Sequence, residues 1–205
     1  MTDNKQVALA ITGASGAPYA QRLLEILLAS NITVHLMVSA AGRIVLSDEL
    51  DWKLPARAGD IQAMLAEQYG CEREQIRVYG EQQWSAPLAS GSHRVPTMIV
   101  CPCTMGTLSS IAVGQSDNLI NRAADVMLKE NKKLILCPRE TPLSLVHVKN
   151  MELLLQGGAI MLPANPYFYS GAKTLEELAD TVVARVLDHI GIDHAISPRW
   201  PEERD

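Results

Sequence analysis

Short runs of consecutive apolar residues alternate along this chain with longer segments in which apolar residues recur every three or four positions. The runs predict buried strands at 6–12, 32–39, 97–101 and 133–137, with shorter strands at 76–79 and 159–162. The periodic segments predict helices from the turn at 13–18 to about 30, and at 40–49, 60–70, 104–131, 142–156 and 175–191. A kink at 114–116 is expected to divide the helical segment 104–131.

Strands that are apolar on both faces, each followed by a helix, are typical of a parallel sheet covered by helices on both sides. The alternation runs through the chain with no repeat, low-complexity tract or linker to divide it. The pattern therefore predicts one doubly wound α/β domain, Rossmann-like or flavodoxin-like, over residues 1–205.

The composition narrows the possible partners. The 205 residues are 47% hydrophobic and 20% charged with a net charge of -5, and no basic stripe favours nucleic acid. No apolar run approaches the roughly 20 residues that a membrane span needs. The first residues lack a basic stretch before a long apolar core, so we expect no signal peptide and a cytoplasmic location.

The cysteines and histidines give no metal site. Cys101 and Cys103 have no second pair at ligand spacing and no histidine nearby in sequence. The four cysteines, which include Cys71 and Cys137, are expected to be small buried residues at strand ends. The five histidines share no pattern, and we assign them no role.

The turn after the first predicted strand reads Gly13-Ala14-Ser15-Gly16-Ala17-Pro18. Its glycines let the backbone pass close to a ligand, Ser15 can donate a hydrogen bond, and Pro18 suits a first helical turn. Ser15 is also the expected N-cap of the helix. The turn does not match G-x-G-x-x-G, yet free amides at a helix start favour an anion, so we predict that it contacts a ligand. A phosphate is expected either at this turn or at the helix start 104–107.

Two later strands end in comparable chemistry. The run 97–101 stops at Pro102 and is followed by hydroxyl residues, Thr104 and Thr107 among them, at a predicted helix start. The run 133–137 ends in Pro138, Arg139 and Glu140, where open α/β sheets bind ligands. Arginine suits a phosphate through its planar fork, and a nearby carboxyl can transfer a proton.

Other charged and aromatic residues allow two interpretations each. Arg122 and Lys129 lie seven positions apart on one helical face, which is either solvated beside Asp125 or directed at a ligand. Arg185 lies mid-helix among apolar residues, so it either snorkels to solvent or faces an anion. Trp84, in the loop 81–96, either pins that loop or stacks on a planar cofactor.

Glu49, at the end of a predicted helix, would by default be a solvated residue. Tyr169 and Lys173, together with the early TGASG, outline a short-chain dehydrogenase. That chemistry needs both side chains on one helical face, whereas Gly171 between them and Pro166 before them indicate a loop. The dehydrogenase interpretation is therefore disfavoured.

Taken together, these motifs resemble the UbiX family of flavin prenyltransferases, formerly described as aromatic-acid decarboxylases. The likeness runs from ITGASGA through NRAADVMLKE and PRETPLS to the C-terminal helix. Related flavin-dependent cysteine decarboxylases carry PASANT-type and PAMN-type segments, where this chain has PCTMGT and PRETP. The prenyltransferase branch is the better match.

The resemblance implies a doubly wound flavoprotein that assembles as trimers into a homododecamer. It implies that reduced FMN accepts a dimethylallyl group from dimethylallyl monophosphate, at N5 and then C6, without a metal. The product, prenylated FMN, would serve a separate UbiD-type decarboxylase, with a place in ubiquinone biosynthesis.

The resemblance also implies roles for individual residues. The residues that match FMN contacts are Gly13, Ala14, Ser15, Ser39, Thr104, Met105, Gly106, Thr107 and Arg139. Those that match the prenyl-phosphate cluster are Arg122, Lys129, Arg139, Glu140, Tyr169 and Arg185, with Lys129 expected from a neighbouring subunit. Ser15, Glu49 and Trp84 match residues beside the reacting centre, and with Arg122, Lys129 and Glu140 they form the expected catalytic set.

Two other functions stay open from the sequence. One is a flavin-dependent decarboxylase of an aromatic or cysteinyl acid, and the other is a non-catalytic FMN carrier. The chain has more basic candidates than the single phosphate of FMN requires, which favours the transferase over the carrier. Breaking an allylic C–O bond without a metal requires fixed cations that hold the leaving phosphate.

Overall fold

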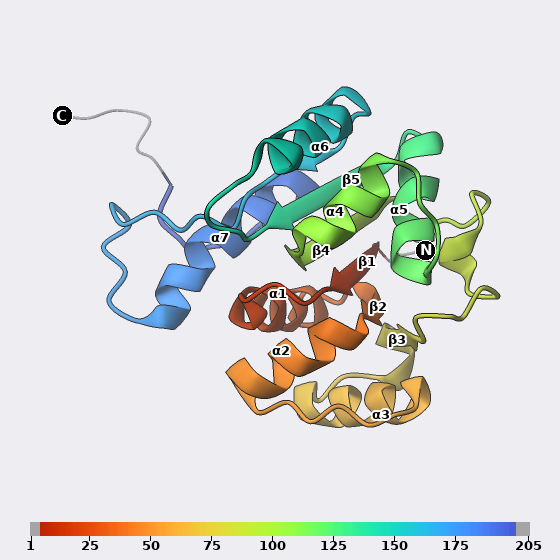
Figure 1. Ribbon diagram of the computed structural model, residues 1–205. Coiled ribbons are helices and arrows are strands. Elements are labelled where there is room, and N and C mark those ends of the chain that lie inside the picture. The colour runs from red at the N-terminus through yellow and green to blue at the C-terminus, as the bar shows by residue number, and fades with distance from the viewer. Residues whose placement is uncertain (1–4, 200–205) are drawn as a thin grey trace.

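The computed structural model describes residues 5–199, which form a six-stranded sheet with helices on both faces (Figure 1). The strands are β1 (Gln6–Ile11), β2 (Thr33–Val38), β3 (Ile76–Tyr79), β4 (Thr97–Cys103), β5 (Lys133–Pro138) and β6 (Ile160–Met161). The helices are α1 (Ala17–Ala29), α2 (Ala40–Leu50), α3 (Ala58–Tyr69), α4 (Met105–Ala112), α5 (Leu119–Lys129), α6 (Leu145–Gln156) and α7 (Leu175–Ile190). Two short 3₁₀ turns lie at Arg73–Gln75 and Pro87–Ala89.

The strand order is β3-β2-β1-β4-β5-β6, and every neighbouring pair is parallel. The chain therefore starts in the middle of the sheet, moves outward to β3, and returns past β1 to build the other half. This is a doubly wound α/β fold, as the sequence predicts. Its topological switch point lies between β1 and β4, where ligands bind at the carboxyl ends of the strands.

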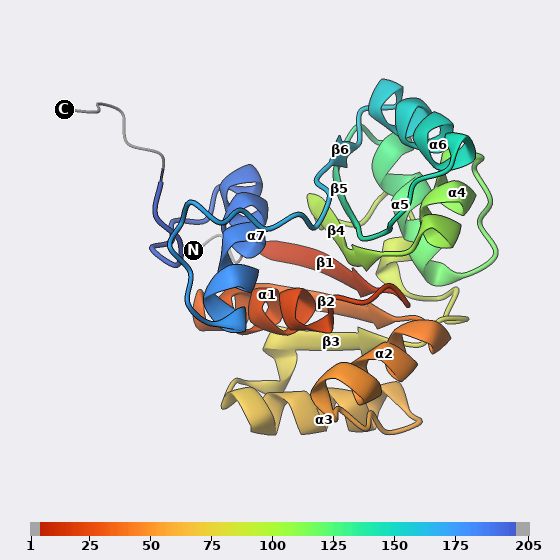
Figure 2. The same cartoon turned by 60° about the vertical axis from the view of Figure 1, so that its left-hand side comes forward.

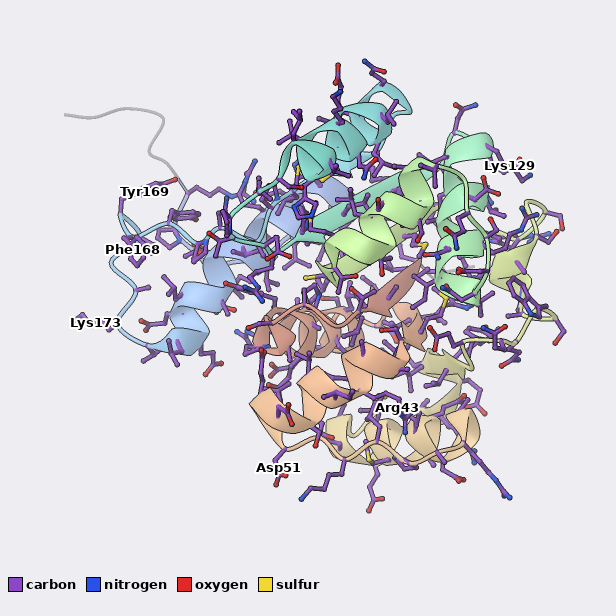
Figure 3. The ribbon with its side chains drawn as sticks, viewed as in Figure 1. Arg43, Asp51, Lys129, Phe168, Tyr169 and Lys173 are labelled. Atoms are coloured by element: carbon purple, nitrogen blue, oxygen red, sulfur yellow. The ribbon has the colours of Figure 1, made fainter. Side chains whose placement is uncertain are left out.

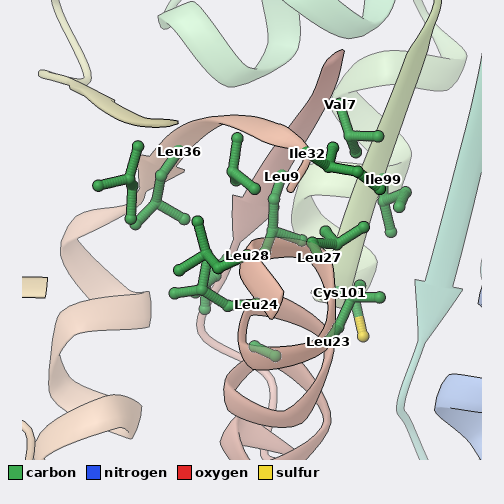
Figure 4. Close-up of a cluster of buried hydrophobic side chains, with 14 of the residues drawn as sticks. Val7, Leu9, Leu23, Leu24, Leu27, Leu28, Ile32, Leu36, Ile99 and Cys101 are labelled. Atoms are coloured by element: carbon green, nitrogen blue, oxygen red, sulfur yellow. The ribbon is translucent and has the colours of Figure 1, made fainter. Parts of the chain in front are cut away.

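Each face of the sheet packs against its own set of helices (Figure 2). On β1, Leu9 and Ile11 face a core shared with α1, α3 and α7, whereas Ala8 and Ala10 face a core shared with α4 and α5. Figure 4 shows the leucines of α1 packed on the strands of the first core. Leu23, Leu24 and Leu27 are fully buried there, and truncation of such a leucine to alanine typically costs about 2–5 kcal/mol.

Most predicted helices and strands are present. Their bounds differ from the prediction where a capping residue, a proline or a shift in strand pairing changes the end of an element. The segment 104–131 is two helices, as expected, because Asn118 caps α5 after the break. Helix α6 begins at Leu145 rather than at 142, since Ser144 caps it and Pro142 lies before it. Strand β4 continues through Pro102 to Cys103, with its pairing to β5 shifted after Val100.

None of the helices within residues 5–199 combines the length and the apolar character required to cross a membrane. The cysteines of this part of the chain are free thiols, and Cys101, Cys103 and Cys137 are buried, as expected. For Cys71 the expectation is wrong, because this residue is only partly buried and follows α3 rather than a strand. Burial raises the pKa of the Cys103 thiol, so this residue is a neutral component of the core.

Candidate active site

The turn after β1 does not end as the sequence predicts. The residue before α1 is Gly16, whose φ of 123° is open to glycine, and Ser15 makes no capping bond. Instead, the Glu49 carboxylate on α2 accepts hydrogen bonds from the Gly16 and Ala17 amides at 2.9 and 2.8 Å. The prediction of Ser15 as N-cap is wrong, because a carboxylate from another helix already satisfies these amides and the positive end of the dipole.

Glu49 is therefore a structural anion rather than a solvated residue. Burial raises its pKa, but hydrogen bonds from Ser15, Gly16 and Ala17 and the charge of Arg139 outweigh that effect and leave the pKa below its ordinary value. The side chain is ionised at neutral pH. A second anion at this helix start would meet both occupied amides and a like charge, so the start of α1 is closed to phosphate.

The start of α4 is open by the same test. Thr104 caps this helix by accepting a hydrogen bond from the Thr107 amide at 3.1 Å, and the Leu108 amide donates to the Thr104 carbonyl at 3.0 Å. Among residues 5–199, neither the Met105 nor the Gly106 amide has a protein acceptor. Two free amides at a helix N-terminus form a position of the kind that binds a phosphate or another anion.

A buried threonine that the sequence analysis missed holds this helix start in place. The Thr12 hydroxyl donates to the Pro102 carbonyl at 2.8 Å and accepts from the Thr104 amide at 2.8 Å. It thus joins the end of β1 to the turn between β4 and α4. A hydroxyl residue at the last position of an apolar strand was the available signal.

Arg139 and Ser39 complete the group around the switch point. Arg139 follows β5, and its Nε donates to the Ser15 carbonyl at 3.0 Å. Its Nη groups have no hydrogen bond or ion pair within the described residues, so they are free to face an anion. Ser39 caps α2 by accepting from Gly42 at 3.0 Å, which leaves its hydroxyl hydrogen to donate.

The packing of the first turn against α2 requires glycine at position 13. A Cβ on Gly13 would lie 2.4 Å from the Ala41 Cβ, so the first turn can approach the start of α2 only with glycine. Residues 13–15, Ser39, 104–107 and Arg139 therefore converge at the carboxyl ends of β1, β2, β4 and β5, as expected for a flavin site.

Trp84 and Arg122 lie near the same edge of the sheet. The loop that carries Trp84 is fixed by the Leu119 amide, which donates to the Glu81 carbonyl at 2.8 Å, and the Trp84 side chain is half exposed. Arg122 donates to the Ala89 carbonyl at 3.1 Å and pairs with Asp125 at 2.8 Å. Arg122 thus has the partner that the solvated-face interpretation gave it, and it also anchors this loop.

Lys129 does not join this group within one chain. It ends α5, whose first turn lies at the carboxyl edge of the sheet, and it pairs with Glu130 at 2.5 Å. Figure 3 shows Lys129 on the opposite side of the molecule from Tyr169. Lys129 and Tyr169 are therefore far apart in one chain, and the supply of Lys129 by a neighbouring subunit stays a prediction.

Tyr169 and Arg185 form a third group. Tyr169 stacks on Tyr167 with ring centroids 4.4 Å apart, and Arg185 pairs with Asp188 at 2.7 Å. Both line a hollow of about 510 Å³ to which neither Arg139 nor the first turn contributes. Glu140 follows Arg139 and is exposed, and its carboxylate accepts from the Thr141 amide at 3.0 Å.

The chain is similar to proteins of known family. Residues 1–187 match the Flavoprotein family, so the chain belongs to a class of flavin-binding α/β proteins. Flavin prenyltransferase UbiX of Pseudomonas aeruginosa is 47% identical over 99% of this chain and 97% of its own length. The mitochondrial flavin prenyltransferase PAD1 of Saccharomyces cerevisiae is 39% identical over 96% of this chain and 75% of its own length. The chain is a member of the UbiX family of flavin prenyltransferases.

Solved structures agree. A UbiX protein crystallised with FMN and dimethylallyl pyrophosphate superposes with a TM-score of 0.86 at 35% identity, over 98% of this chain and 100% of its own. A structure from Escherichia coli O157:H7, described as a dodecameric FMN-dependent UbiX-like decarboxylase, gives a TM-score of 0.83 at 38% identity, over 96% and 99% of the two chains.

Proposed function

We propose that this enzyme transfers the dimethylallyl group of dimethylallyl monophosphate to N5 and then C6 of reduced FMN. The product is prenylated FMN, which a UbiD-type decarboxylase uses. The observation that carries the proposal is the open start of α4 beside the free Nη groups of Arg139. These groups provide two distinct anion positions at one switch point, one for the FMN phosphate and one for the phosphate of the prenyl donor.

FMN supplies the nucleophilic ring system when it is bound. The Met105 and Gly106 amides would hold its phosphate. The hydroxyls of Ser39 and Thr107 would bind its polar chain, while Thr104 donates to the Thr107 hydroxyl at 2.9 Å. Ser15 and Glu49 are hydrogen bonded to each other beside this position. Because Glu49 is ionised, its role is to accept the Ser15 hydrogen bond and fix that hydroxyl, rather than to act as an acid.

The leaving phosphate needs fixed positive charge, since the proposed reaction uses no metal. Arg139 would supply it at the switch point. The Glu140 carboxylate beside it would take the proton that the flavin loses when its new bond forms and pass that proton to the departing phosphate. Trp84 offers an indole face to the allylic cation, which is worth about 0.5–2 kcal/mol.

We further propose that this chain forms a homo-oligomer, since the relative from Escherichia coli is described as dodecameric, and that copies of the chain share the site. Lys129 lies on the far side of the molecule and the Tyr169–Arg185 hollow is a separate group. A neighbouring copy can bring these residues to the donor phosphate where one chain cannot. A mixture of inactive Lys129→Ala and Ser15→Ala subunits should then recover activity in mixed oligomers, and verified mixed oligomers without activity would contradict sharing.

The decisive experiment is anaerobic incubation of the protein with reduced FMN and dimethylallyl monophosphate, followed by mass analysis of the flavin. We expect the flavin to gain one dimethylallyl unit, with or without a chelator. Dimethylallyl pyrophosphate forms a parallel arm, because the crystallised UbiX relative is described with that compound. Unmodified flavin with all donors would overturn the proposal.

A direct decarboxylase is the second candidate, because a relative from Aquifex aeolicus, 33% identical, is described as a phenylacrylic acid decarboxylase. Release of CO₂ from an aromatic acid by the FMN-loaded protein, without prenyl donor, would favour that activity. A cytoplasmic location and a place in ubiquinone biosynthesis stay predictions.

A further inference from the structure

Helix α6 leaves most of its apolar surface uncovered. Only Asn150 and Leu154 are buried along its length. Its exposed aliphatic side chains, with Leu143 just before the helix, are Leu143 (49% exposed), Leu145 (69%), Val146 (63%), Val148 (48%), Leu153 (50%) and Leu155 (54%). Figures 1 and 2 show α6 on the outside of the molecule, beyond β5 and beside α4.

The inner side of α6 already packs on its own chain, so the described part of the chain does not cover the exposed residues. Asn150 donates to the Ser109 hydroxyl on α4 at 2.6 Å, and Leu154 packs in the core beneath. Exposed Lys149, Glu152 and Gln156 interrupt the outer surface of α6, but aliphatic side chains make up more of it. A helix surface with this many exposed aliphatic side chains is typical of one that packs against another protein surface. Within α6 only Lys149 and Glu152 belong to the four charged residue types, a composition typical of permanent subunit interfaces.

We propose that the exposed face of α6, made of the six aliphatic residues above, is covered by a second copy of this chain. The inference rests on the homo-oligomer of the proposed function and assigns the surface that builds it. Residues 141–144 join Glu140 directly to α6. A copy seated on α6 therefore lies next to Arg139 and Glu140, where the site lacks the residues that its own chain holds elsewhere.

The test is the mass of the purified protein in solution, measured by light scattering without flavin or donor. The variant Val146→Glu/Leu153→Lys places two charges on one stripe of α6 and leaves the net charge unchanged. The new glutamate lies in the first turn of α6 and the new lysine in its last turn, so both charges are favourable to the helix dipole and the fold should persist. Circular dichroism will test whether the variant is folded. Val113→Lys, at an exposed valine that ends α4 (67% exposed), is the control.

We expect the wild type and Val113→Lys to be oligomers of the same mass, and the α6 variant to fall to a smaller species. An α6 variant that keeps the wild-type mass, or a monomeric wild type, would overturn the proposal.

A second measurement does not depend on the folding of that variant. Leu153→Cys and Val113→Cys change the surface little, and maleimide labelling can be located by peptide mapping. We expect maleimide to label the cysteine at position 113 and to leave the cysteine at position 153 unlabelled. In a single chain both positions are exposed. Equal labelling would refute a covered α6. Both experiments omit flavin and donor. Their results therefore test the covered α6 separately from the prenyl transfer, and either proposal can be refuted while the other stands.

Discussion

The starts of α1 and α4 look alike in sequence and differ in the folded protein. Both helices follow a buried strand next to the switch point, and both begin among small and hydroxyl residues. At α1 the amides are taken by Glu49, whereas at α4 the Met105 and Gly106 amides are free. A helix N-terminus thus becomes an anion site only where the rest of the fold leaves its amides unpaired. For this reason we propose that the flavin phosphate binds at the start of α4.

The largest expected effect comes from closing α4 in the way that Glu49 closes α1. In Gly106→Asp the new carboxylate lies at the free amides and repels a phosphate. Loss of two charge-assisted hydrogen bonds at about 1.5–3 kcal/mol each predicts an FMN affinity about 10²–10⁴-fold weaker. Gly106→Ala is the control, because a Cβ there meets only the Thr104 hydroxyl, at 3.9 Å. Calorimetric titration with FMN measures both, and an unchanged affinity in Gly106→Asp would place the phosphate elsewhere.

Arg139 lies between the two helix starts, and its removal should weaken the binding of phosphate at the open start of α4. Arg139→Ala loses the Nη groups as well as the 3.0 Å bond to the Ser15 carbonyl. We expect phosphate-bearing ligands to bind about 10–10²-fold more weakly, from a loss of about 1.5–3 kcal/mol. Arg139→Lys keeps the charge without the fork and should recover only part of the affinity. Full affinity in the alanine variant would remove Arg139 from the site.

Thr12 should affect the position of α4 rather than its charge. Thr12→Val keeps the shape of the side chain but leaves the Thr104 amide without its acceptor, while the Pro102 carbonyl keeps only the hydrogen bond from the Thr12 amide, at a cost of about 1–3 kcal/mol in unfolding free energy. FMN affinity should also fall, and Thr12→Ser should restore both quantities. Denaturant unfolding and FMN titration test this, and if valine bound FMN as well as serine, Thr12 would have no positioning role.

The smallest effect is expected at the closed helix start. Glu49→Gln keeps an oxygen for the amides but loses its charge, so unfolding free energy should fall by about 0.5–2 kcal/mol at neutral pH. Since the folded pKa of Glu49 lies below its ordinary 4.5, its stabilisation is present above pH 4.5 and is lost as pH falls through the folded value. The difference between wild type and Glu49→Gln should therefore shrink in acid. A constant difference across that pH range would contradict the ionised cap.

Local chemistry made much of the fold predictable. The apolar strands and periodic helices fixed the doubly wound order, and the side chains of Ser39, Thr104, Asn118 and Thr174 cap helices within three residues of themselves. The groups that follow the strand ends were also predictable, because parallel strands deliver their carboxyl ends to one edge. For this reason 13–15, Ser39, 104–107 and Arg139 meet where the sequence analysis expected them.

What the sequence could not determine depends on residues far apart in the chain. Glu49 reaches the start of α1 from 33 positions away, and Thr12 reaches Thr104 from 92 positions away. Neither contact leaves a periodic or short-range signal, so the closed and open helix starts were indistinguishable before folding. The sequence by itself determined the fold, the family and the edge of the sheet at which we propose that flavin binds. Only the tertiary structure decided which helix start is free and which charged residues a single chain holds apart, because long-range packing determines which hydrogen-bonding groups are already paired.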